Sequence, residues 1–366
     1  MLVGFTFDLR QEYLDMGYSE EDTAEFDSPI TINAVTETLS QLGFEVDRIG
    51  HARTLSKRLA RGNRWDFVFN ICEGIGGYSR ESQVQSLLES HGIPYTFSDP
   101  VVTMHTLHKA TAKSIVHMAG GRTPEYLVID SSCSLDNVDL QYPLFAKPIA
   151  EGTGKGIDSK SIVRNRSELE AVIPVLLAKF KQAALLETYL PGREFTVGVV
   201  GTGDKARCIG MMEIVLNDKA EKGVYSFVNK EFWEELVAYR PLAAEPELRK
   251  ELEKQTLLAW RALGCRDGGR VDLRLDTKGQ PHFLEVNPMA GLNPNHSDLP
   301  ILCSFEGIGY NELIRDIVVH TLERVQNSQS TIKMLSELTF RMVQPIVSTH
   351  QTLSAHTCSE NIINSI

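Results

Sequence analysis

Residues 267–300, DGGRVDLRLDTKGQPHFLEVNPMAGLNPNHSDLP, contain two segments in which polar and apolar side chains alternate. Alternation with a period of two is typical of strands that have one packed face and one open face, and it predicts strands over residues 270–275 and 282–287. Between them, residues 276–280 include Gly279 and have the composition of a tight turn. The stretch therefore predicts a β-hairpin.

The turn also predicts the register of the hairpin. A turn centred between residues 278 and 279 places Asp272 opposite Glu285 and Arg270 opposite Asn287, all on one face. Directly opposed side chains have Cβ atoms about 5 Å apart, so the two carboxylates would repel by roughly 3 kcal/mol at an effective dielectric near 20. A cation between them removes this repulsion. Carboxylate and amide oxygens suit Mg²⁺, and two such ions can clamp a polyphosphate.

The second predicted strand ends in a loop of a kind that often carries functional groups. Glu285 and Asn287 are followed directly by Pro288 and by a loop that contains Gly291. Irregular backbone with free N–H groups at a strand end is a common location for binding and catalytic groups. The alternative interpretation is a solvated hairpin face whose charges have no role.

Composition restricts the class of protein. The 366 residues include 48 acids against 37 lysines and arginines, a formal charge of −11, which argues against a general nucleic-acid or anionic-membrane binder. The six cysteines form no C-x-x-C pair, which favours reduced thiols. The apolar run before Asp8 is too short for a signal peptide, and no segment has the length of a membrane span. We therefore expect a cytoplasmic protein.

The first hundred residues alternate between strand and helix patterns. The predicted strands are 2–7, 44–49, 65–70 and 94–97, and the predicted helices are 30–42, 56–60 and 81–90. This alternation is typical of a doubly wound parallel sheet, which binds ligands at the carboxyl ends of its strands. Those ends are the loops 8–27 and 70–80. Asp27 in the first loop is a candidate ligand-binding acid, or alternatively the cap of the helix that follows it.

A second unit begins near residue 103 with a predicted helix over 107–119 that carries Lys109. The strand LFAKP, 144–148, contains Lys147, and the loop EGTGKG, 151–156, follows it. Glycines let backbone amides approach a polyphosphate closely, so Gly152, Thr153 and Gly154 are candidate phosphate contacts. The loop is not a Walker loop, because Ser or Thr does not follow its GK pair.

Further strands are predicted at 126–129, 184–190, 195–201 and 207–216, and helices at 167–181, 245–263 and 308–324. Beyond residue 326 the tail has few charges and a possible amphipathic helix over 332–343, for which packing against the body or a partner is the expected role.

GRVDLRLD…FLEVNPMAG resembles the closing motif of ATP-grasp carboxylate–amine ligases, and in particular of D-alanine–D-alanine ligases. AKPIAEGTGKGI resembles the strand and phosphate loop of the same family. The resemblance implies a mixed α/β ATP-grasp fold whose N-terminal domain is the doubly wound sheet. The implied divisions are an N-terminal domain over 1–102, a central subdomain over 103–191, a C-terminal subdomain with the metal site over 192–325, and a tail of unknown role over 326–366.

The resemblance also implies roles for individual residues. Asp272, Glu285 and Asn287 would bind Mg²⁺, with two ions expected and Mn²⁺ possible, while Arg270 and the Gly291 amide would stabilise the tetrahedral intermediate. Lys109, Lys147 and Lys230 would neutralise ATP phosphates. Glu187 and the backbone that includes Tyr189 and Leu190 would contact the adenine, Glu194 the ribose, and Asp27 the ammonium of the first substrate. An ion pair with Arg193 is the alternative role for Glu194.

Three differences from the family pattern lie around the substrate pocket. Glu73 stands where the family has His, Glu231 stands where it has Tyr, and Asp298 stands where a Leu would help to hold the second alanine's carboxylate. An acid there disfavours a carboxylate or favours a cationic group. We therefore expect an ATP-dependent ligase that joins small-molecule amino acids or amines other than two D-alanines through an acyl phosphate, with a homodimer as a candidate assembly. The alternatives are a D-alanine–D-alanine ligase proper, a ligase for substrates that are not amino acids, and a nucleotide-binding scaffold without turnover.

Overall fold

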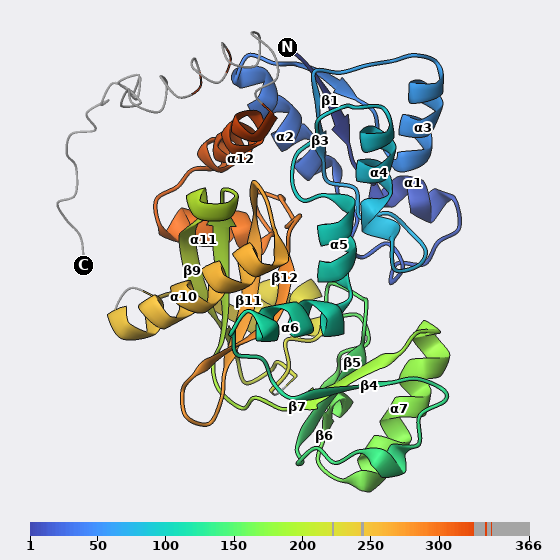
Figure 1. The fold of residues 1–366 in the computed structure, drawn as a ribbon, viewed down its shortest axis with the longest axis vertical. Coiled ribbons are helices and arrows are strands. Elements are labelled where there is room, and N and C mark those ends of the chain that lie inside the picture. Colours follow the sequence, from blue (N-terminus) through green and yellow to red (C-terminus); the bar gives the residue numbers. More distant parts are fainter. Residues whose placement is uncertain (222, 243–244, 326–333, 335–337, 339–366) are drawn as a thin grey trace, which may run out of the picture.

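The computed structural model describes residues 1–221, 223–242 and 245–325, together with Met334 and Leu338. Three sheets form its framework, with strand orders β2-β1-β3, β4-β7-β5-β6 and β10-β9-β8-β11-β12. Figure 1 shows them as three neighbouring parts of one body, with helices between and around them. The first sheet is parallel and the other two are antiparallel, which makes the fold a mixture of α/β and α+β architecture.

The N-terminal sheet has β1 (Leu2–Thr6) between β2 (Glu45–Arg48) and β3 (Phe67–Asn70). Its helices are α1 (Arg10–Asp15), α2 (Pro29–Gln41), α3 (Ala52–Ala60) and α4 (Gln83–Ser90). The predicted fourth strand over 94–97 is confirmed only in part, as a single parallel bridge between Tyr95 and Val68 of β3. Phe97 ends the extended run with a φ of 69°, and its N–H donates to the Asp267 carboxylate rather than to a strand.

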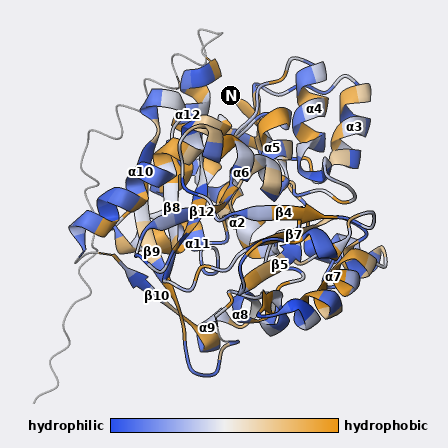
Figure 2. Cartoon of the chain, turned by 60° about the horizontal axis from the view of Figure 1, so that its bottom comes forward, coloured by the Kyte–Doolittle hydropathy of each residue, from blue (hydrophilic) through white to orange (hydrophobic). Residues whose placement is uncertain are grey.

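The central sheet contains β4 (Tyr126–Ile129), β5 (Leu144–Pro148), β6 (Ile162–Val163) and β7 (Ala184–Thr188), and α7 (Arg166–Phe180) packs against it. In Figure 2, β4 and β5 consist mostly of hydrophobic residues. Short 3₁₀ helices lie at Arg80–Ser82, Leu135–Asn137, Ser159–Ser161 and Gly203–Lys205.

The helix predicted over 107–119 is confirmed as α6 (Lys109–Met118), which begins two residues later than predicted. A further helix that was not predicted, α5 (Pro100–Leu107), precedes it. His108 separates them with a ψ of 91°, and its Nδ1 accepts from the Thr111 N–H at 3.3 Å, so it caps the second helix. This break places Lys109 at the start of α6, where it faces the site described below.

The C-terminal sheet contains β8 (Glu194–Val200), β9 (Arg207–Leu216), β10 (Val237–Pro241), β11 (Gly268–Leu275) and β12 (Pro281–Asn287). The short helices α8 (Phe227–Glu231) and α9 (Trp233–Leu236) precede β10, and α10 (Pro246–Leu263) packs on the sheet through the fully buried Trp260. Figure 2 shows hydrophilic residues along the outer side of α10.

The hairpin of β11 and β12 has the predicted register where the polar residues lie. Asp272 pairs with Glu285 and Arg270 with Asn287, whereas nearer the turn Leu273 pairs with Phe283. The turn is therefore centred on Lys278, half a residue earlier than predicted. A bulge between Asp272 and Leu273 restores the predicted pairing farther from the turn. A bulge adds one residue to one strand and so shifts every pair beyond it by one.

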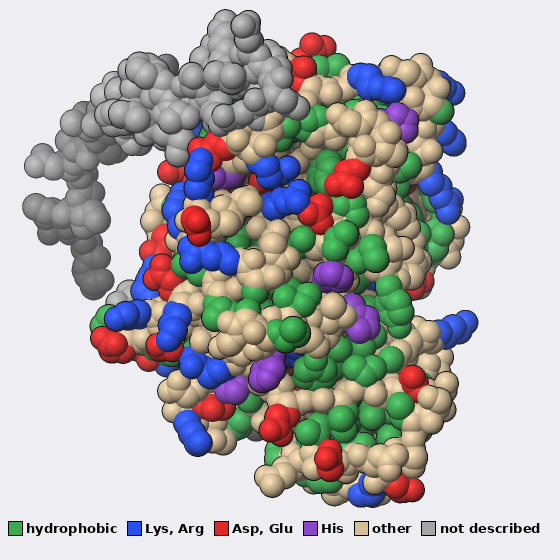
Figure 3. Space-filling model, viewed as in Figure 1, with side chains coloured by type: hydrophobic (Ala, Val, Ile, Leu, Met, Phe, Trp, Pro, Cys, Tyr) green, Lys and Arg blue, Asp and Glu red, His purple; other side chains and the backbone are tan. Residues whose placement is uncertain are grey.

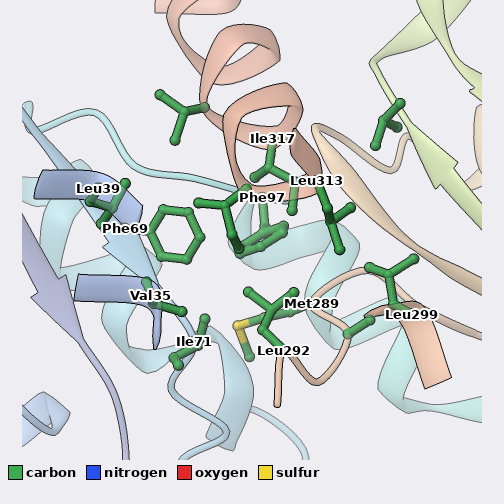
Figure 4. Close-up of a cluster of buried hydrophobic side chains, with 14 of the residues drawn as sticks. Val35, Leu39, Phe69, Ile71, Phe97, Met289, Leu292, Leu299, Leu313 and Ile317 are labelled. Atoms are coloured by element: carbon green, nitrogen blue, oxygen red, sulfur yellow. The ribbon is translucent and has the colours of Figure 1, made fainter. Parts of the chain in front are cut away.

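One hydrophobic core joins the N-terminal sheet to the C-terminal part of the chain. Figure 4 shows Phe69 and Phe97 packed near Leu313 of α12 (Tyr310–Val325), with Met289 and Leu292 close by. Leu299 of α11 (Asp298–Phe305) belongs to the same cluster. The loop that carries Gly291 is therefore anchored on both sides by buried apolar residues.

The predicted tail helix over 332–343 lies outside the described residues except for Met334 and Leu338, which pack on this core. None of the helices within the described ranges is both long enough and apolar enough to cross a membrane. On the face shown in Figure 3, basic and acidic side chains are interspersed.

Candidate active site

Two adjoining cavities lie where the three sheets meet. The first is between the central and C-terminal sheets, and the second lies between the C-terminal sheet and the N-terminal loops. They share Lys109, Glu151, Tyr225, Lys230 and Glu285. Every residue predicted for the site lines one or both of them: Asp27, Lys109, Lys147, Gly152, Thr153, Gly154, Glu187, Tyr189, Leu190, Glu194, Lys230, Arg270, Asp272, Glu285, Asn287 and Gly291.

A buried charge triad forms the inner end of the first cavity. Glu187 on β7 lies 2.8 Å from the Lys147 ammonium on β5 and 2.9 Å from that of Lys113 on α6. Burial opposes ionisation of Glu187, but the two lysines outweigh it and hold the pKa of the carboxyl below its ordinary value. Burial lowers the pKa of Lys113 to about 8. With both lysines charged, the triad carries one net positive charge, which suits a phosphate.

The outer part of the first cavity is a flat slot between aromatic and polar groups. Phe145 and Tyr189 stack with ring centroids 6.4 Å apart, and the Arg274 guanidinium lies 5.2 Å from the centre of the Tyr189 ring. Arg274 also pairs with Glu194 at 3.2 Å. The alternative ion pair between Glu194 and Arg193 is not formed, because Arg193 binds Glu213 and Glu245. Aromatic faces and a guanidinium are groups against which a planar ring can pack, and the Glu194 carboxylate lies beside them.

The polar face of the hairpin lies at the junction of the cavities. Asp272 accepts from the Thr196 hydroxyl at 2.6 Å, from the Asn287 amide nitrogen at 3.3 Å and from the Arg270 guanidinium at 3.3 Å. Opposite it, Glu285 lies 3.3 Å from the Lys109 ammonium. The repulsion expected between the two carboxylates is thus offset by side chains of this chain. Burial raises the pKa of Glu285, but Lys109, Lys147, Lys230 and Arg270 outweigh it and lower the pKa below the ordinary value.

The donor set of this face fits a magnesium ion. Two carboxylates lie directly opposite each other, and Asn287 uses its amide nitrogen toward Asp272, which leaves the amide oxygen as a further ligand. In the described part of the chain, no three His, Cys, Asp or Glu side chains are grouped closely enough to hold a metal. A few protein oxygens completed by phosphates and water are the usual shell of Mg²⁺ at nucleotide sites.

The second cavity extends from Arg270 and Gly291 to the N-terminal loops. Ser297 packs against Gly291 so closely that a Cβ on the glycine would lie 2.7 Å from the Ser297 hydroxyl. That hydroxyl accepts from the Asn293 N–H at 3.0 Å, which tightens the loop. Asp27 lines the cavity and does not cap α2, whose N-cap position is Ser28. Burial and the nearby Asp8 raise the pKa of Asp27 to about 8.

The glycine loop is tied to the N-terminal domain by an ion cluster. Glu25 lies 3.0 Å from Lys155 of the loop and 3.2 Å from Arg80, whose other nitrogen donates to the Ala150 carbonyl at 3.0 Å. These side chains are at most 8% exposed. A Cβ at Gly152 would lie 2.0 Å from the Glu25 carboxylate, so only glycine fits there. The loop is therefore held closed over the junction of the cavities.

Several of these groups were missed by the sequence reasoning. Lys113, Arg274, Glu25 and Lys155 contact predicted site residues, and Arg80 is linked to the site through Glu25. Lys113 has a usable signal, because it follows Lys109 by four residues and so shares its face of a helix. Glu25 and Lys155 are 130 residues apart, and nothing in either local pattern connects them.

The arrangement of the three sheets matches solved structures. The D-alanine–D-alanine ligase from Bacillus anthracis, solved as a complex with ATP, matches with a TM-score of 0.69 and 23% identity over 89% of this chain and 99% of that chain. A D-Ala:D-Ser ligase from Enterococcus faecalis matches with a TM-score of 0.67 and 20% identity over 87% of this chain and 99% of that chain. Fold and site together define a protein of the ATP-grasp class.

The sequence comparisons narrow this class to a family. The family profile described as D-ala D-ala ligase C-terminus matches residues 125–319. The D-alanine–D-alanine ligase of Bordetella petrii is 34% identical over 268 residues, which are 73% of this chain and 78% of the relative. An uncharacterised protein of Sinorhizobium fredii is 32% identical over 256 residues, 69% of this chain and 73% of the relative. The chain belongs to the D-alanine–D-alanine ligase family and is an ATP-dependent ligase, as the resemblance indicated.

Proposed function

We propose that this ligase joins a carboxylate to an amine through an acyl phosphate, and that its substrates are not two D-alanines. ATP occupies the first cavity and the two organic substrates share the second. The carboxylate of the first substrate attacks the γ-phosphorus, ADP leaves, and the amine then attacks the acyl phosphate to give an amide and phosphate. Catalysis in such a reaction consists mostly of positioning and charge stabilisation.

The nucleotide is bound by charges that the structure brings together. The buried triad of Lys113, Glu187 and Lys147 has a net positive charge at the inner end of the slot. Lys109 and Lys230 line both cavities, so they lie where the γ-phosphate passes from one substrate to the other. The slot beside Tyr189 and Leu190 takes the adenine, and Glu194 takes the ribose hydroxyls.

Magnesium ions would be held by Asp272, Glu285 and Asn287. When bound, they supply positive charge that offsets the charge developing on the transferred phosphoryl group. Two ions are part of this proposal, and Glu285 would be among the residues that hold them. The glycine loop covers the phosphates through Gly152, Thr153 and Gly154, and the Glu25 cluster keeps it closed so that water is excluded from the acyl phosphate.

Acyl transfer takes place in the second cavity. The Arg270 guanidinium faces the developing oxyanion together with the Gly291 N–H, and preorganised donors of this kind stabilise a tetrahedral intermediate. Asp27 lies at the N-terminal end of the cavity, where its carboxyl would release its proton as the ammonium of the first substrate binds beside it, since a nearby cation lowers a carboxyl pKa. The related enzymes are named for joining D-alanine to D-alanine.

The observation that carries the proposed change of substrate is the position of Asp298. Its carboxylate lies 3.8 Å from the Arg270 guanidinium and lines the second cavity. A substrate carboxylate placed there would be repelled by roughly 1–4 kcal/mol near a surface. Glu73, which replaces a histidine of the family pattern, lines the other end, and burial together with Glu81 and Glu25 raises its pKa well above the ordinary value.

The proposal is tested by supplying ATP, Mg²⁺ and a panel of amino acids and amines, singly and in pairs. Phosphate release is followed, and amides are identified by mass spectrometry. We expect release that requires an organic substrate, with one pair preferred and two D-alanines a minor pair. Phosphate release that never depends on an added carboxylate or amine would contradict ligase turnover and favour a nucleotide-binding scaffold.

A further inference from the structure

An aromatic wall closes the second cavity beside α11. Trp233, at the start of α9, lies with its ring centroid 5.4 Å from that of Tyr239 and 6.0 Å from that of His296. The Trp233 indole N–H donates to the His296 ring at 2.6 Å, which fixes the orientation of both rings. All three side chains line the cavity. The indole is partly accessible, so its face is available to a ligand.

A carboxylate stands against this wall. The Asp298 side chain is 11% exposed and lies at the N-terminus of α11. It lies near the Tyr239 hydroxyl, whose pKa is raised by burial and by the Asp298 charge, and that hydroxyl is 2.8 Å from the Tyr225 hydroxyl. Its cationic neighbour is Arg270, at 3.8 Å, but that guanidinium is nearer to Asp272, at 3.3 Å. The positive charge near Asp298 is thus shared between two carboxylates.

The other acids that line the cavity have raised pKa values or lie in ion pairs. Burial raises the pKa of Asp27 to about 8 and that of Glu73 well above its ordinary value. Glu25, Glu81, Glu151 and Glu285 lie within ion-pair distance of Arg80, Lys155 or Lys109. Lys109 and Lys230 also line the first cavity, where the phosphates are expected. The end of the second cavity beside α11 therefore combines aromatic faces with an acid that lacks a full counter-charge.

We propose that the amine substrate carries a second positively charged group, which lies against Trp233 and Tyr239 and is neutralised by Asp298. The proposal rests on the proposed function and specifies its acceptor. Aromatic faces attract cations through the ring quadrupole, and a nearby carboxylate adds direct charge attraction. A neutral aliphatic group would fill the same space but would leave the Asp298 carboxylate without compensation.

Matched substrate pairs test the charge requirement. Lysine is compared with norleucine, and 1,4-diaminobutane with butylamine, because the members of each pair have similar length and differ in the terminal ammonium. Amide formation is measured with ATP, Mg²⁺ and the preferred carboxylate from the panel. We expect the charged member to be preferred by about tenfold or more in kcat/KM, chiefly through KM. Equal use of both members would overturn the inference but not the ligase function.

Substituting Asp298 separates binding of the ligand from orientation of Arg270. Asp298→Asn removes the charge, so the preference for lysine over norleucine is expected to fall to about threefold or less. If Asp298 only orients Arg270, both substrates slow by the same factor and the preference stays, which would overturn the inference. Glu234→Gln is the matched control, since it removes an exposed acid from the same helix as Trp233 and is expected to leave the preference unchanged.

A binding measurement tests the inference without turnover. Trp65 and Trp260 are buried, so partly accessible Trp233 is the tryptophan whose fluorescence a ligand in the cavity changes most. Titration with 1,4-diaminobutane is done in the presence of Mg²⁺ and a non-hydrolysable ATP analogue, with butylamine as the comparison. We expect saturable quenching by the diamine at about tenfold lower concentration, lost in Asp298→Asn and retained in Glu234→Gln. Identical titration curves for the two amines would contradict the inference.

Discussion

Asp272 and Glu285 face each other directly across the hairpin of β11 and β12. Two opposed carboxylates destabilise a hairpin unless a cation lies near both. Arg270 lies 3.3 Å from Asp272, and Lys109 lies 3.3 Å from Glu285. The same pair of acids is therefore balanced by side chains in this structure, and the proposed function assigns it to metal ions when nucleotide brings additional negative charge.

Replacing Glu285 by glutamine should abolish turnover while preserving the fold. The change removes one of the two charges of the proposed Mg²⁺ site and leaves a side chain of the same shape. Mg²⁺-dependent phosphate release and a thermal melt are measured on the variant and on Glu253→Gln, which removes an exposed acid from α10. Retained Mg²⁺-dependent turnover in Glu285→Gln would exclude the assigned metal role.

Removing the Lys147 ammonium should weaken ATP binding. Lys147→Ala leaves the buried Glu187 with Lys113 alone and removes the net positive charge of the triad. We expect the ATP dissociation constant to rise by more than about fivefold, which exceeds the roughly 0–1 kcal/mol of an exposed ion pair. Calorimetry measures it, with the exposed Lys160→Ala as the control. Equal affinities in wild type and Lys147→Ala would count decisively against a phosphate contact.

Loosening the glycine loop should uncouple ATP hydrolysis from amide formation. Lys155→Met removes the 3.0 Å contact between the loop and Glu25, while Arg80 still neutralises that carboxylate. Water then reaches the acyl phosphate more often. We expect more phosphate released per amide formed, together with faster proteolysis of the loop. The ratio of phosphate to amide is the decisive quantity, and a ratio identical to that of the wild type would show that the cluster does not control closure.

The Asp27 carboxyl predicts a pH dependence of stability. Its pKa is raised to about 8 from the ordinary 3.8 by burial and by Asp8, so the folded protein keeps a proton that the unfolded chain loses. Between those two pH values the folded state binds more protons, and stability falls as pH rises. Asp27→Asn removes this dependence. Between pH 6 and pH 8, the free energy of unfolding measured with urea should therefore fall less in Asp27→Asn than in the wild type. Equal decreases in the two proteins would contradict the raised pKa.

The sequence predicts those parts of the fold that are determined by residues close together in the chain. The alternation on either side of Gly279 is enough to pair Asp272 with Glu285, because the side chains on a strand repeat every two residues. The bulge and the true centre of the turn were not predicted. Their effects on the register cancel beyond the bulge, so Asp272 still pairs with Glu285 as predicted. The break at His108 depends on a side-chain cap, a detail that a helical pattern of apolar residues does not contain.

Contacts between distant segments were not predictable from either segment alone. The sequence shows Lys155 only as a member of a glycine-rich loop, and its contact with Glu25 depends on the tertiary fold. Trp233 and His296 come together in the same way, across 63 residues. The domain boundaries, the individual site roles and a homodimer stay predictions. The comparisons show the family, and the geometry of the second cavity supports a change of substrate within it.

The measurement that tests the central claim most directly is a competition among substrates. The protein is supplied with ATP, Mg²⁺ and D-alanine alone, and then with a mixture of D- and L-amino acids and small amines, and the products are resolved by chiral chromatography. The account predicts that D-alanyl-D-alanine is a minor product of the mixture and that an amide of a cationic amine dominates. If D-alanyl-D-alanine forms fastest and dominates the mixture, Asp298 has not changed the acceptor and the account is wrong.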